Sequence, residues 1–189
     1  MRSRIGICVG MLFLSFAGCS STNTSSPPND AGSQTPTLPT VEKAPWVTFQ
    51  SSEGKFVVSF PFEPVEKEST TPAGFTKRQV RAVLHNGQLV YSVQYATGPP
   101  PEDVRQMLTQ AQAGMIQAQR GTLLREDEIR LGDWYGRAFS FSFESNNQPG
   151  LLHTRIYSVE DRVFILMVGG SPEYTSESDA ERFFKSFSL

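Results

Sequence analysis

KRQVRAVLHNGQLVYSVQY, residues 77–95, places apolar residues at every second position on both sides of an Asn-Gly pair. Asn86-Gly87 is a strong hairpin signal, because both central residues of the tight turn between two strands need a positive φ. A two-residue turn sets His85 opposite Gln88 and so fixes the register. We expect one face of this hairpin to be core and the other, from Arg81 to Gln94, to be mostly solvated. The expected core face holds Val80, Ala82, Leu84, Leu89, Tyr91, Val93 and Tyr95.

The same period of two recurs along the rest of the chain. KFVVSF, residues 55–60, puts its two phenylalanines on one face together with Val58. YGRAFSFSF, residues 135–143, does the same for Tyr135 and three phenylalanines. Residues 151–159 and 162–168 predict a second hairpin that turns at Glu160-Asp161, and the charged run from Leu124 to Leu131 predicts an edge strand.

Two segments follow a helical period instead. Residues 102–121 predict an amphipathic helix of about five turns, with two carboxylates in its first turn and Gly121 at its end. The residues expected on its inward stripe are Val104, Met107, Leu108, Ala111, Met115 and Ala118. The last helix is expected to begin at Thr175 or Ser176 as N-cap, with Asp179 three residues after Ser176. Its inward side chains are expected to be Ala180, Phe183, Phe184 and Phe187.

These elements predict an α+β domain, an antiparallel sheet covered by two helices. Residues 45–189 hold the aromatic and β-branched residues, and their number suits one domain. No second linker and no internal repeat divides them.

Three blocks carry a resemblance to a known family: WVTFQSSEGKFVVSFPFEP (46–64), LGDWYGRAFSF (131–141), and TRIYSVEDRVFILMVGG (154–170) with SDAERFFKSFSL (178–189). In this order they resemble proteins of the Mog1/PsbP-like fold, an α/β/α sandwich. The resemblance implies that fold and no catalytic residue. Its photosystem members carry Gly-Tyr-x-Phe followed by Tyr-Pro-x-Gly-Trp. This chain has Gly54-Lys55-Phe56 followed by Phe60-Pro61-Phe62-Glu63-Pro64, without that Tyr and that Trp, so it is closer to the family's uncharacterised bacterial exported branch.

The N-terminus reads as an export signal. Residues 1–18 contain Arg2 and Arg4, an apolar run of about a dozen residues, and then Ala17-Gly18. The run is shorter than the ~20 residues that a spanning helix needs. Cys19 after these small residues resembles the lipobox of bacterial lipoproteins, with Phe16 where Leu, Val or Ile is usual. We expect a signal peptide cleaved before a diacylated Cys19; the alternative is a secreted protein with a free N-terminal Cys.

The mature chain would then be tethered to a bacterial membrane through the lipid on Cys19. Ser20 rather than Asp follows the Cys, which favours the outer membrane over the inner one. Residues 19–44 are rich in Ser, Thr and Pro and predict a disordered linker. Without residues 1–18, Lys+Arg falls from 17 to 15 against 19 acidic residues, a formal net charge of −4. Nothing here indicates a nucleic-acid partner.

A search for catalytic and ligand-binding patterns finds none. His85 and His153 are far apart and neither has a second metal ligand at a suitable spacing. Glu126, Asp127 and Glu128 alternate between strand faces, so they predict a solvated edge. There is no G-x-S-x-G and no glycine-rich phosphate loop. We therefore expect neither enzymatic activity nor a metal or cofactor.

What remains is a surface for a partner. Trp134-Tyr135-Gly136 and the Pro-rich turn at 98–101 are candidates for exposed aromatic and apolar area. For Trp134 we favour the simpler interpretation that it caps the core. The leading hypothesis is a non-enzymatic, lipid-anchored interaction or accessory module that docks on a cell-envelope complex. The alternative is a carrier of a small apolar ligand held between sheet and helix.

The Cys19 hypothesis makes a direct prediction. Cys19→Ser should move the protein from the membrane fraction to the soluble fraction, because the substitution removes the acylated thiol. Fractionation of cells followed by immunoblotting measures this. If the variant stays in the bilayer, the apolar N-terminal run itself is the anchor.

Overall fold

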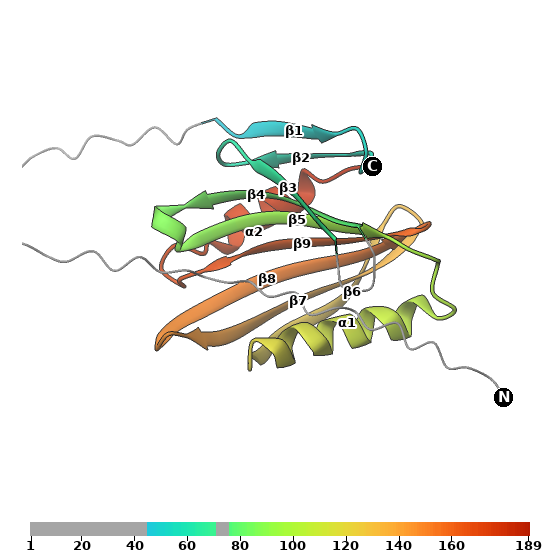
Figure 1. Cartoon of the computed structure of the whole chain (residues 1–189). Helices are drawn as coiled ribbons and strands as arrows, with labels where there is room; N and C mark the ends of the chain where they lie inside the picture. Colours follow the sequence, from blue (N-terminus) through green and yellow to red (C-terminus); the bar gives the residue numbers. More distant parts are fainter. Residues whose placement is uncertain (1–44, 71–75) are drawn as a thin grey trace, which may run out of the picture.

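The computed structural model describes residues 45–70 and 76–189. Their core is a fully antiparallel seven-stranded sheet in the order β3-β4-β5-β9-β8-β7-β6 (Figure 1). Helix α1 packs against β7 and β8 on one face. The opposite face carries helix α2 and the separate hairpin β1-β2. The expected α+β architecture, a sheet with helices on both faces, is confirmed.

The strands and helices follow one another in a simple order. The strands are β1 (Val47–Ser51), β2 (Phe56–Phe60), β3 (Val65–Thr70), β4 (Thr76–Leu84), β5 (Leu89–Thr97), β6 (Thr122–Leu131), β7 (Trp134–Ser145), β8 (Gln148–Val159) and β9 (Arg162–Gly170). The helices are α1 (Val104–Ala118) and α2 (Glu177–Lys185), with a single 3-10 turn at His85–Gly87.

The β4-β5 hairpin has the register that its turn predicts. Leu84 pairs with Leu89, and the Gln88 backbone N–H donates to the His85 carbonyl at 3.1 Å. Asn86 and Gly87 have φ values of 54° and 94°, the conformation that favours Asn-Gly here. The expected core face is buried except at Leu84, which is half-buried.

The expectation that the other hairpin face is mostly solvated is wrong for Ser92 and Gln94, which are 0% and 2% exposed. The cause is the position of β5 inside the sheet, between β4 and β9. Ser92 lies beside Met167, and its hydroxyl accepts a hydrogen bond from Gln79 Nε2 at 3.1 Å. Sequence alternation alone does not distinguish an inner strand from an edge strand.

Helix α1 is shorter than predicted. It begins after Asp103, the N-cap, whose carboxylate accepts from the Gln106 N–H at 3.0 Å. The expected inward stripe is confirmed at Leu108 and Ala111, which are buried, but Ala118 is exposed. The buried polar residue Gln112 was not expected inward. It donates to Glu126 at 2.8 Å and accepts a hydrogen bond from Arg137, so its amide is satisfied against the sheet.

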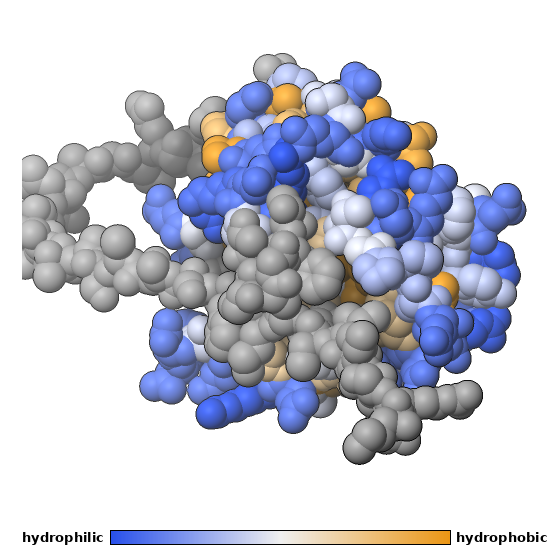
Figure 2. Space-filling view, turned by 45° about the vertical axis from the view of Figure 1, so that its right-hand side comes forward, coloured by the Kyte–Doolittle hydropathy of each residue, from blue (hydrophilic) through white to orange (hydrophobic). Residues whose placement is uncertain are grey.

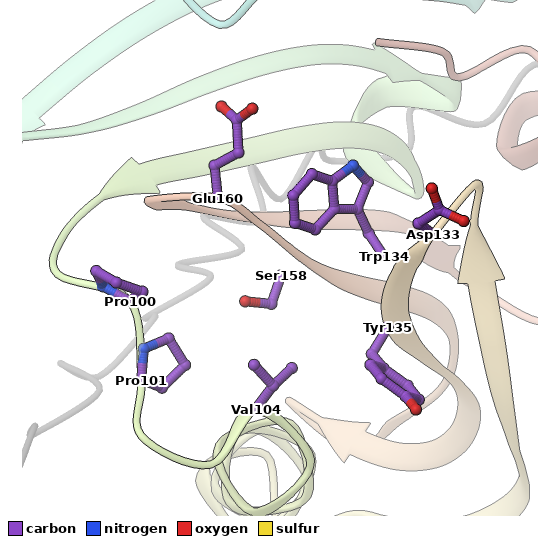
Figure 3. A pocket seen from close by; sticks show the side chains of 8 residues that line it. All are labelled: Pro100, Pro101, Val104, Asp133, Trp134, Tyr135, Ser158 and Glu160. Atoms are coloured by element: carbon purple, nitrogen blue, oxygen red, sulfur yellow. The ribbon is translucent and has the colours of Figure 1, made fainter.

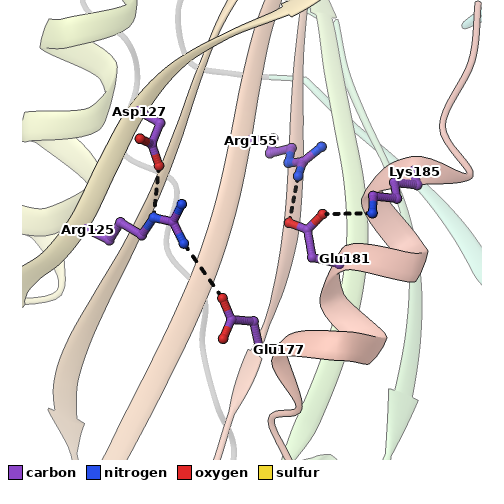
Figure 4. A network of polar contacts seen from close by, with 6 residues as sticks. All are labelled: Arg125, Asp127, Arg155, Glu177, Glu181 and Lys185. Carbon is purple, nitrogen blue, oxygen red and sulfur yellow. Dashed lines mark hydrogen bonds and ion pairs between the residues drawn. The ribbon is translucent and has the colours of Figure 1, made fainter.

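Helix α2 follows its prediction closely. The Ser176 hydroxyl accepts from the Asp179 N–H at 3.4 Å, and all four expected inward side chains are buried. Polar contacts fix its outer side to the sheet (Figure 4). Arg155 of β8 lies 2.6 Å from Glu181, and Arg125 of β6 lies 3.8 Å from Glu177.

The β1-β2 hairpin is joined to the rest of the core by aromatic side chains and by the end of the chain. Phe56 lies between Tyr95, Phe164 and Phe187, with ring centroids 5.5 to 5.8 Å away. Val57 forms a two-way backbone bridge with Ser188, with N···O distances of 2.9 and 3.0 Å. These contacts bring residues from both ends of the domain into one cluster.

Removing one ring tests how much this aromatic cluster contributes to the stability of the domain. Phe187→Ala should lower the free energy of unfolding by about 3–5 kcal/mol, because the side chain is 4% exposed and its loss leaves a cavity. Urea unfolding measures the change. Lys185→Ala, whose side chain is 76% exposed, is the control and should change little. A loss near zero for Phe187→Ala would mean that the cluster does not hold the hairpin.

Candidate functional site

The two segments singled out as a partner surface lie together at one end of the sheet (Figure 3). They border a cavity of about 580 Å³. Its lining combines aromatic and aliphatic side chains with two carboxylates at the rim. The lining residues are Pro100, Pro101, Val104, Asp133, Trp134, Tyr135, Ser158 and Glu160.

Three turns and one helix end meet here. The prolines follow β5, Val104 opens α1, and Asp133 and Trp134 lie where β6 turns into β7. Glu160 lies in the β8-β9 turn, where its φ of 53° lets the chain reverse. The backbone closes the same corner, since the Gly98 N–H donates to the Asp161 carbonyl at 2.8 Å. The cavity is therefore built on paired strand ends and not on one long loop.

The favoured interpretation of Trp134, that it caps the core, is wrong. Trp134 is 37% exposed and belongs to neither of the two buried hydrophobic clusters. In Figure 3 its indole borders the opening beside the Glu160 side chain. The candidate partner residue is thus available at the surface.

Tyr135 is set between two arginines. The guanidinium carbons of Arg130 and Arg105 lie 4.2 and 4.8 Å from its ring centroid. Arg105 also donates to the Tyr135 hydroxyl at 3.4 Å. That hydrogen bond, and the charge of Arg130, lower the pKa of the Tyr135 phenol.

The remaining polar groups around the cavity are few. Ser158 contributes a hydroxyl between the apolar walls and is 5% exposed. Asp133 and Glu160 supply the carboxylates, and no histidine or cysteine lines the cavity. The lining therefore combines the hydroxyls of Ser158 and Tyr135 with two carboxylates.

The other residues considered from the sequence do not form a second site. His85 stacks on Tyr174 with ring centroids 4.2 Å apart. His153 is half-buried rather than a surface side chain, and burial lowers its pKa. Within residues 45–70 and 76–189 no group of three or more metal-ligating side chains comes together. Glu126 accepts from Gln112 and Arg137, which lower its pKa, so it belongs to the contact between α1 and the sheet.

Cys19 lies outside the described residues, as do the expected signal peptide and linker. In the part of the chain that the structure describes, no helix has the length and hydrophobicity to cross a membrane.

Other large hydrophobic side chains are also exposed, among them Phe62, Val65, Leu124 and Leu189. On the face shown in Figure 2, hydrophobic residues emerge in small patches among hydrophilic ones. A second cavity of about 490 Å³ lies at the other end of α1. Its lining, from Arg120 and Thr122 to Pro149 and Pro172, is more polar.

Sequence reasoning named Trp134, Tyr135 and the Pro-rich turn but missed Ser158, Glu160 and Val104 as their neighbours. Glu160 was assigned correctly to a hairpin turn. The missing step was strand order, which places the β8-β9 turn beside β5 and the β6-β7 turn nearby. Local sequence patterns do not encode that order.

Comparison with solved structures supports the fold. The solution structure of cyanobacterial PsbP (CyanoP) from Synechocystis matches with a TM-score of 0.57 at 10% identity, over 87% of this chain and 99% of that chain. A crystal structure of a Bacteroides thetaiotaomicron protein matches with a TM-score of 0.46 at 14% identity. That match covers 75% of this chain and 47% of that protein, so this chain spans about half of that protein's length. No family model and no curated relative matches the sequence.

The fold is therefore PsbP-like. At these identities the likeness concerns backbone architecture and assigns no site.

The charge environment of Tyr135 gives a testable titration. Its phenol should ionise at a lower pH than an ordinary tyrosine, and Arg105→Ala should raise that pKa by removing the hydrogen bond that stabilises the phenolate. NMR titration of protein labelled at the tyrosine Cζ carbons measures both. Arg125→Ala, which removes a cation that pairs with Asp127 and Glu177, should leave the Tyr135 titration unchanged. If the Tyr135 pKa is the same in Arg105→Ala as in the wild type, Arg105 does not stabilise the phenolate.

Proposed function

We propose that this domain is a non-enzymatic protein-interaction module that binds a partner at the Trp134 cavity. One observation carries the proposal: an exposed tryptophan and two prolines from distant segments border a single cavity with largely apolar walls. Partners typically bind through a few aromatic or aliphatic anchors set into such pockets. The cavity lining is mostly apolar and contains neither histidine nor cysteine, which supports binding over catalysis.

We also propose that the protein is exported and held on a bacterial membrane by a lipid on Cys19, with the outer membrane favoured. The N-terminal pattern supports this. The position of the cavity suits such a tether. Trp46, where the domain begins, packs on Tyr91, whereas the cavity lies beyond Thr97 at the other end of β5. Six residues of strand separate the two by roughly 20 Å, so the linker would join the domain away from the cavity.

A second function has a specific observation in its favour. The cavity lies between the first turn of α1 and the sheet, and its volume of about 580 Å³ suits a small molecule. A carrier of a small apolar ligand is therefore the alternative. The two functions differ in what should accompany the purified protein.

Affinity capture from membranes solubilised in mild detergent separates them. Trp134→Ala should reduce the captured partner by roughly ten-fold or more, because loss of a central aromatic anchor commonly costs 2 kcal/mol or more. Mass spectrometry should follow both proteins and small molecules. Tyr174→Ala is the matched control, since Tyr174 is also 37% exposed but lies away from the cavity.

Equal capture by the wild type and Trp134→Ala would exclude the cavity as the docking point. A small molecule that leaves with the Trp134→Ala substitution, without any protein partner, would favour the carrier.

A further inference from the structure

At the rim of the cavity, one of the two carboxylates has no ion-pair partner among the described residues. Asp133 and Glu160 are its charged lining residues, and no lysine or arginine lines it. Glu160 is within 3.4 Å of Arg162. The Asp133 carboxylate has no ion pair or hydrogen bond with any side chain among the described residues; Arg130 bonds instead to the Asp133 backbone carbonyl at 3.3 Å.

The nearby arginines are already engaged. Arg105 and Arg130 pack on Tyr135, and Arg105 lies 3.9 Å from Glu128. Arg162 is 13% exposed and donates to the Gly54 carbonyl at 2.6 Å. A basic group from outside would therefore meet a carboxylate that no arginine of this domain neutralises directly.

The two tryptophans differ in the contacts that their rings make. Trp46 packs on Tyr91 and lies under Arg182, with distances of 5.9 and 4.4 Å to its ring. Trp134 has no aromatic neighbour and no cation over its ring in the part of the chain that the structure describes. An indole face that is open at a cavity edge suits a second aromatic ring or a cation.

Resting on the proposed function, we propose that the occupant is a protein segment in which a tyrosine or tryptophan is flanked by lysine or arginine. The aromatic side chain enters between Trp134, Val104 and Pro101, where the apolar walls replace its water. Its polar tip can reach the Ser158 hydroxyl, and the flanking cation meets Asp133 at the rim. The charge of the rim distinguishes this occupant from an acidic segment or a fatty acid, whose carboxylate would be repelled.

Two short peptides test the inference on the full-length protein. Ac-Lys-Tyr-Lys-NH2 and Ac-Glu-Tyr-Glu-NH2 share the anchor and differ in charge. The protein has two tryptophans, so the ¹⁵N-labelled chain in detergent micelles gives two indole N–H signals, which Trp134→Phe assigns. The Trp134 signal reports binding at the cavity, and the Trp46 signal is an internal control.

We expect the lysine peptide to shift the Trp134 signal with a dissociation constant about two- to five-fold lower than that of the glutamate peptide, the size of an exposed charge contact. The preference should shrink in 0.5 M NaCl and in Asp133→Asn. Glu173→Gln, an exposed carboxylate elsewhere on the surface, should preserve it.

Equal affinity for both peptides would overturn the basic partner and leave the interaction module standing. A preference that survives in Asp133→Asn would overturn the role of Asp133. If neither peptide moves the Trp134 signal, the cavity is no aromatic docking site and the proposed function at this site fails with it.

Discussion

The structure depends on the contact between Phe56 and the rings around it. The seven-stranded sheet is held by its own ladders, but the β1-β2 hairpin is a separate sheet. A two-stranded hairpin alone is marginally stable in water. Phe56 binds it to Tyr95 and Phe164 of the sheet and to Phe187 after α2. One side chain thus links the sheet with both elements that cover this face.

On the other face of the sheet, the packing of α1 positions the candidate site. α1 covers β7 and β8 through Leu108 and Ala111, and the buried contact of Gln112 with Arg137 and Glu126 fixes its position. Its first turn then stands beside the strand ends where three connections converge. The cavity is the space that these turns leave beyond the helix, which is why its walls come from three segments that are far apart in the sequence.

Much of the fold could be predicted from sequence because its signals are local. Asn86-Gly87 sets a turn, alternation sets a strand face, and Ser176 caps a helix. The errors arise where tertiary context decides: Ser92 and Gln94 are buried by neighbouring strands, and Ala118 is exposed because α1 ends there. The edge strand β3, with the charged sequence VEKEST, was not predicted. For the site, Trp134 and Tyr135 were found from composition, but their neighbours required the strand order.

The bridge between Val57 and Ser188 has a consequence for how the protein is made. The chain's penultimate residue completes a core that its first strands began, so this contact spans nearly the whole domain. Pairings so distant in sequence form late, after a large loss of loop entropy. Before Phe187 and Ser188 are synthesised, the hairpin therefore has its ring contacts with Tyr95 and Phe164 available but lacks those with the end of the chain.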